Sequence, residues 1–105
     1  MIGQVLSEVS AVVAPEREPE LVAAYRELVA LPLPDGLIRT ELLRGAEGRW
    51  RVQSVWRSRA ALEAVRSSPK LRAAPHLFRD AGAEPELAVF DIAVRRVVPA
   101  EVWAG

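Results

Sequence analysis

The chain has 105 residues, of which half are hydrophobic, with 14 basic and 14 acidic side chains and no cysteine. A zero net charge without a basic block argues against a nucleic-acid partner, and no apolar run approaches the roughly 20 residues of a membrane span. The lack of cysteine excludes thiol catalysis, disulfides and cysteine-based zinc sites. We expect a cytoplasmic protein with one domain over residues 1–105, comprising a core at about 4–97 and a tail at 98–105.

The first half of the chain predicts a strand, a helix and a hairpin. Alternating residues predict a strand over 5–13. A helix should follow Pro15 and Pro19 and end at the segment LPLPDG, because its apolar residues recur at helical spacing: Leu21, Ala24, Tyr25, Leu28 and Val29. The segments 36–45 and 49–57, separated by GAEG, predict two hairpin strands. In the second of these strands, alternation places Trp50, Val52, Ser54 and Trp56 on one face.

The second half predicts a broken helical segment and a last strand. Ser58 is a candidate N-cap for a helix over 59–67, and Ser68 and Pro69 suit the start of a second piece, which we expect Pro75 to interrupt. The last strand is expected over 87–97. The order β-α-β-β-α-β is that of a ferredoxin-like α+β fold, with both helical segments on one face of a four-stranded antiparallel sheet.

Both faces of the last predicted strand are largely apolar. Leu87, Val89 and Ala93 face one way, and the residues between and after them face the other: Ala88, Phe90, Ile92 and Val94. Helices on one face leave the other bare, so we expect a homodimer joined through its sheet faces, burying about 1,200 Å² or more. Trp103 in the tail is either a clamp on the partner subunit or part of a frayed end.

The central stretch PDGLIRTELLRGAEGRWRVQSVWRSRAALEAVRSSP resembles the antibiotic biosynthesis monooxygenase family. The recurring features are Gly36 before the second strand, the hairpin around Gly48, Trp56 at the end of the third strand, and Ser58 before a helix. The resemblance implies a dimeric α+β barrel with a small-molecule cavity between sheet and helices. Its enzymatic members are implied to oxidise electron-rich aromatics, such as anthrones, with oxygen and without metal, flavin or other cofactor.

The resemblance also implies site residues. Trp56 matches a tryptophan that lines the family's cavity, and His76 lies where quinone-forming members carry an arginine. Two positions depart from that pattern: Val52 stands where an asparagine is expected and Leu62 where a tyrosine is expected. The haem-degrading branch is disfavoured, because Ala64 and Val65 stand where its helical tryptophan would lie.

We take His76 and Trp56 as the candidate catalytic residues, with the substrate-binding candidates Ser7, Tyr25, Ser54, Leu62 and Phe78, and no metal ligand. For His76 two interpretations stay open. A regular helix would turn it to solvent, whereas a kink at Pro75 would turn it into the cavity as a general base or anion partner.

Three functional hypotheses follow. The first is a cofactor-independent oxygenase for an aromatic or polyketide-like molecule. The second is a non-catalytic small-molecule-binding dimer, favoured by Val52 and Leu62, whose side chains neither donate nor accept hydrogen bonds. The third is a structural dimer with a filled core. A cavity beside Trp56 would argue against the third.

Overall fold

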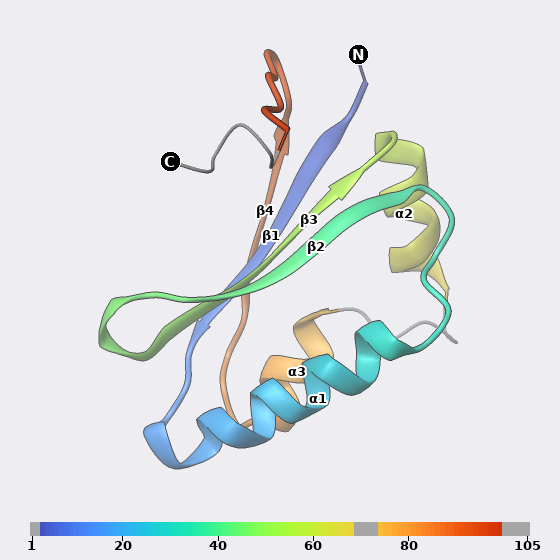
Figure 1. Cartoon of the computed structure of the whole chain (residues 1–105). Coiled ribbons are helices and arrows are strands. Elements are labelled where there is room, and N and C mark those ends of the chain that lie inside the picture. The colour runs from blue at the N-terminus through green and yellow to red at the C-terminus, as the bar shows by residue number, and fades with distance from the viewer. Residues whose placement is uncertain (1–2, 69–73, 100–105) are drawn as a thin grey trace.

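A computed structural model describes residues 3–68 and 74–99 of the chain (Figure 1). The elements follow the predicted order, with two short 3-10 turns added: β1 (Val5–Val12), η1 (Pro15–Arg17), α1 (Glu18–Ala30), β2 (Leu37–Arg44), η2 (Ala46–Gly48), β3 (Arg49–Trp56), α2 (Arg59–Ser67), α3 (Ala74–Asp80) and β4 (Glu86–Asp91). Pro69 and Trp103 lie outside the described residues. None of the helices in the described part of the chain is both long enough and apolar enough to span a membrane.

The four strands form one antiparallel sheet in the order β2-β3-β1-β4. This is the predicted ferredoxin-like α+β fold. The register aligns the site residues: Ser7 of β1 is opposite Ser54 of β3, which is in turn opposite Thr40 of β2. These three hydroxyl-bearing residues therefore form a row across the sheet, pointing to the same face.

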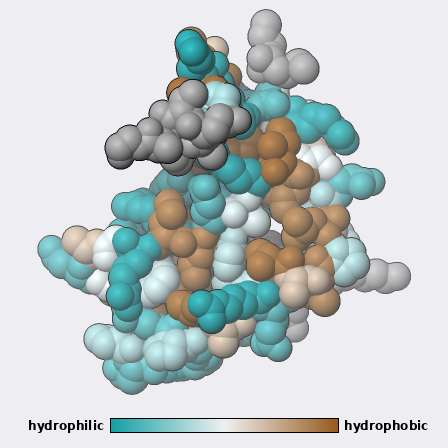
Figure 2. Space-filling view, in the orientation of Figure 1, coloured by the Kyte–Doolittle hydropathy of each residue, from teal (hydrophilic) through white to brown (hydrophobic). Residues whose placement is uncertain are grey.

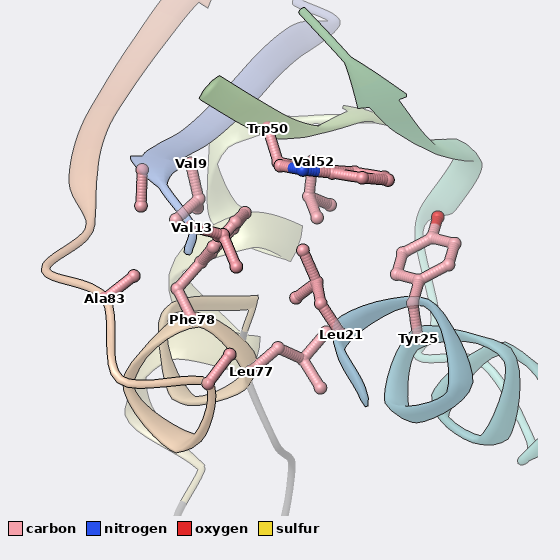
Figure 3. Packing of buried hydrophobic residues seen from close by; sticks show 11 residues of the cluster. Val9, Val13, Leu21, Tyr25, Trp50, Val52, Leu77, Phe78 and Ala83 are labelled. Carbon is pink, nitrogen blue, oxygen red and sulfur yellow. The ribbon is translucent and has the colours of Figure 1, made fainter. Parts of the chain in front are cut away.

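The helices cover one face of this sheet (Figure 1). The main core lies beneath β1 and β3, where α1 supplies Leu21 and Tyr25 and α3 supplies Leu77 and Phe78 (Figure 3). A second cluster joins α2 to the other end of the sheet and includes Trp56. Burying a leucine or phenylalanine completely contributes about 1.5–3 kcal/mol, so these contacts hold the helices in place.

The last strand is shorter than predicted. β4 ends at Asp91 rather than near residue 97. The register explains this, because Asp91 is opposite Val5, the first residue of β1. Among the described residues, which begin at Gly3, the backbone hydrogen bond from the Ile92 amide to the Gln4 carbonyl (3.1 Å) is the one that continues the pairing. A strand without a neighbour has no ladder of hydrogen bonds, whatever its apolar pattern.

The expected interruption at Pro75 lies at the edge of the described residues. α3 is described from Ala74 to Asp80, and residues 69–73, which belong to the earlier part of this predicted helical piece, lie outside the described residues. From Pro75 to Asp80 the segment is helical, and His76 on it is exposed.

Candidate functional site

A cavity of about 200 Å³ lies between the sheet and the helices, beside Trp56. Most of its lining is apolar and comes from all four strands, α1, the α1–β2 loop, α2 and the described start of α3: Ser7, Val9, Tyr25, Leu28, Val29, Leu31, Pro32, Leu33, Pro34, Leu37, Thr40, Val52, Ser54, Trp56, Leu62, Val65, Arg66, Ala74, Pro75 and Leu87. Figure 2 shows a hollow on this side of the molecule, between β2 and α1, bordered by hydrophobic side chains. A mostly apolar cavity with a few polar groups is typical of a small-molecule site.

Trp56 forms a fixed part of the wall. It ends β3, is 6% exposed and packs with Leu62 and Val65 of α2. Its indole Nε1 donates a hydrogen bond to Ser7 Oγ on the neighbouring strand, at 2.9 Å. A buried indole N–H needs such an acceptor, and the bond fixes the orientation of the ring.

Besides Ser7, which accepts the indole bond, three hydroxyl groups of the lining form a chain. Ser54 Oγ donates to Thr40 Oγ1 at 3.0 Å, and Thr40 Oγ1 lies 2.8 Å from the hydroxyl of Tyr25. The strand pairing supplies the first contact, and the packing of α1 against the sheet supplies the second. In Figure 3 the Tyr25 hydroxyl points from α1 towards the sheet.

The environment keeps this phenol protonated. Burial raises the pKa of Tyr25, and the nearby Glu41 carboxylate adds to this effect. The hydrogen bond with Thr40 opposes it. Because the ordinary pKa of tyrosine is already near 10, Tyr25 is a neutral hydrogen-bond donor at physiological pH.

Arg66 is the only charged side chain in the lining, considering the described residues alone. It lies in the last turn of α2, a helix that begins where Ser58 Oγ accepts a hydrogen bond from the Ala61 amide (3.1 Å). Its guanidinium is partly exposed and lies 3.3 Å from the Glu63 carboxylate. Within the described chain, no cluster of three or more histidine and acidic side chains could hold a metal ion.

The structure brings five of the predicted site residues together in the lining: Ser7, Tyr25, Ser54, Trp56 and Leu62. Phe78 is instead completely buried in the core and does not line the cavity. His76 is exposed and is also not part of the lining, as expected for a regular helix whose buried side carries Leu77 and Phe78. The geometry therefore supports the solvent-facing interpretation of His76.

Two polar residues of the lining, Thr40 and Arg66, were not among the site residues predicted from the sequence. Thr40 was predicted only as part of a strand, and its place opposite Ser54 depends on the register between β2 and β3. An irregularity between Leu37 and Arg39 shifts that register, so alternation from Gly36 alone is not a safe guide to which face Thr40 occupies. The sequence places Arg66 among the polar residues of a predicted helix, and nothing in the local pattern indicates that it lines a cavity.

Solved structures with the same fold include three instructive neighbours. SnoaB, a cofactor-independent oxygenase from Streptomyces nogalater, is 20% identical with a TM-score of 0.65, over 92% of this chain and 98% of that chain. A heme-degrading protein from Mycobacterium tuberculosis is 23% identical with a TM-score of 0.65, over 91% and 99% of the two chains. A conserved protein of unknown function from Bacteroides thetaiotaomicron is 17% identical with a TM-score of 0.71, over 88% and 100%.

At these identities the structural likeness establishes the fold alone. A comparison with curated proteins finds no match. The family assignment rests on sequence: the model of the antibiotic biosynthesis monooxygenase family matches residues 6–76, which carry the sheet's first three strands, α1, α2 and most of the cavity. The chain belongs to the antibiotic biosynthesis monooxygenase family.

Proposed function

We propose that this protein is a cofactor-independent monooxygenase that oxidises an aromatic or polyketide-type small molecule with O2. The observation that carries the proposal is the cavity itself, an apolar space of about 200 Å³ with a few hydroxyl groups on one wall. Family membership supports a monooxygenase-like role, and SnoaB has the same fold.

The chemistry suits such a site. An anthrone-type ketone carries a reactive CH2 that is conjugated with the carbonyl through the aromatic rings. This CH2 can lose a proton to water, and the resulting anion can pass electrons to O2. In the net reaction the CH2 becomes a carbonyl group, one oxygen atom enters the product, and the other leaves as water with the two hydrogen atoms. The protein has to bind the ring and stabilise the anion.

In this proposal Trp56 provides a rigid apolar surface for the ring. Its position is set by Ser7 on one side and by Leu62 on the other. His76 has no assigned role, because its side chain is exposed outside the lining. Ser7, already bonded to the indole, acts by positioning Trp56.

Oxygen uptake by the purified protein with anthrones and hydroquinones tests the activity. Leu28→Trp should fill part of the cavity and abolish uptake, because Leu28 lines it from α1. Arg26→Trp is the matched control, an exposed position on the same helix that should leave the rate unchanged. Uptake no faster than without protein, or equal in both variants, would refute the oxygenase.

A second function has an observation in its favour. The lining positions Val52 and Leu62 are apolar where the quinone-forming pattern expects polar groups, which favours a non-catalytic binding protein. The two functions differ in one measurement. A binding protein would take up an aromatic ligand, lose it in Leu28→Trp, and consume no oxygen with any compound tested.

We also propose that the protein is a homodimer joined through the sheet face that the helices leave open. Val12, Leu43 and Phe90 lie on this face and are 55%, 38% and 52% exposed. Sedimentation should show a dimer that Phe90→Glu weakens, while Ala23→Glu on the exposed side of α1 leaves it intact. A monomeric wild-type protein would refute this assembly.

A further inference from the structure

Three of the four hydroxyl groups in the cavity lining form a chain, and this chain contains one hydrogen more than its own contacts use. Ser54, Thr40 and Tyr25 carry three O–H groups joined by two hydrogen bonds. Each bond consumes one hydrogen, so one remains. No further hydrogen bond of these hydroxyl groups is formed to any other part of the described chain.

The position of the free hydrogen follows from the direction of the chain. Ser54 donates to Thr40, so the hydrogen left over belongs either to Tyr25, if Thr40 donates to it, or to Thr40, if Tyr25 donates instead. Both residues line the cavity. In either arrangement this chain therefore presents one hydrogen-bond donor to a ligand, with a second hydroxyl supporting it.

The surroundings make this donor selective. The neighbouring lining residues on the same strands and on α1 are apolar, including Val52, Leu28 and Val29. A donor in such an environment forms stronger hydrogen bonds than in water, and linked hydroxyl groups polarise one another. The raised pKa of Tyr25 keeps the phenol able to donate.

We propose that the Ser54–Thr40–Tyr25 chain is the ligand-orienting subsite of the cavity, and that it selects an apolar ring system bearing a ketone oxygen. This inference rests on the proposed function and names its substrate class. When the CH2 carbon that is conjugated with the ketone loses its proton to water, negative charge develops on the bound oxygen. The free donor stabilises that charge, as the donors of an oxyanion hole do.

The test compares two ligands of one shape. Fluorenone carries a ketone and fluorene a CH2 in the same tricyclic ring, and equilibrium dialysis measures both dissociation constants. The wild-type protein should prefer fluorenone. Tyr25→Phe and Thr40→Val should each weaken fluorenone binding about 3- to 10-fold, the value of one neutral hydrogen bond. Binding of fluorene should stay unchanged.

Two further variants make the test specific. Thr40→Ser keeps the hydroxyl and should retain the preference for fluorenone that Thr40→Val loses. Arg26→Gln, at an exposed position of α1 outside the lining, is the control and should leave fluorenone binding unchanged. Fluorene affinity in each variant reports whether the cavity is intact. If Tyr25→Phe loses affinity for both ligands, the comparison of Thr40→Val with Thr40→Ser tests the hydroxyl chain instead.

Several outcomes would overturn the proposal: equal affinity of the wild-type protein for the two ligands, binding of neither, unchanged fluorenone binding in Tyr25→Phe and Thr40→Val, or a loss in Arg26→Gln as large as in those two variants. Oxygen uptake separates this result from the proposed function. Ketone selection through Tyr25 without oxygen uptake would support the subsite and refute the oxygenase. Uptake that is equally fast in Tyr25→Phe and Thr40→Val would support the oxygenase and refute the subsite.

Discussion

The hydrogen bond between Trp56 and Ser7 should be worth more to stability than a surface hydrogen bond, because both partners are buried. The indole Nε1 and Ser7 Oγ lie 2.9 Å apart, and the two residues are 6% and 8% exposed. Ser7→Ala leaves the indole N–H without an acceptor and should lower the free energy of unfolding by about 1–3 kcal/mol. This is a large share of the roughly 5–15 kcal/mol that stabilises a domain.

A double-mutant cycle isolates this interaction. Trp56→Phe leaves the Ser7 hydroxyl without its donor, so it also carries the cost of an unpaired buried group, in addition to lost packing. The combination of Ser7→Ala with Trp56→Phe leaves neither group unpaired. We therefore expect it to cost less than the sum of the single variants, by about 1 kcal/mol or more.

Urea unfolding followed by far-ultraviolet circular dichroism measures all four proteins without relying on tryptophan emission. Ser10→Ala is the matched control, since Ser10 is equally buried on β1 but faces the opposite side of the sheet. Its combination with Trp56→Phe should be additive within about 0.5 kcal/mol. Additivity in the Ser7–Trp56 cycle as well would refute the assignment of the indole hydrogen bond.

Three other predictions concern local structure. Ser58→Ala should lower the free energy of unfolding by about 1 kcal/mol by removing the cap of α2, and Ser58→Asp should restore most of it. Gly36→Ala should lower the free energy of unfolding by more than about 1 kcal/mol in the same urea assay, because Gly36 has φ +87° and a Cβ there would lie 2.5 Å from Ala61 Cβ. Adding Ala61→Gly should remove the steric clash but not the cost of the positive φ. Unchanged stability of Gly36→Ala would contradict the turn conformation. Tyr25 is the only tyrosine, so tyrosinate absorbance in a pH titration should show ionisation above the ordinary value near 10. With a raised folded-state pKa, its contribution to stability is present below pH 10 and is lost as pH rises through the folded pKa, a loss that Tyr25→Phe should remove.

Much of the fold follows from local signals in the sequence. Alternation in residues 5–13 and 49–57, helical spacing after Pro19 and the cap at Ser58 each depend on neighbouring residues only, and each element forms where predicted. The same alternation placed Ser54 and Trp56 on the inner face of the sheet, where they line the cavity. Element order together with the handedness of crossovers then leaves few topologies, so the ferredoxin-like fold could be predicted as well.

The tertiary structure decided what the cavity contains. Thr40 joins Ser54 through a strand register and Tyr25 through the packing of a helix, and neither distance is encoded by the residues around it. The exposed position of His76 depends on whether α3 is regular at Pro75, and the end of β4 depends on the length of β1. Local sequence determines which elements form, because propensity and capping act over a few residues. Which side chains meet in the site depends on contacts between residues far apart in the chain, and these exist only after the sheet and the helices have packed.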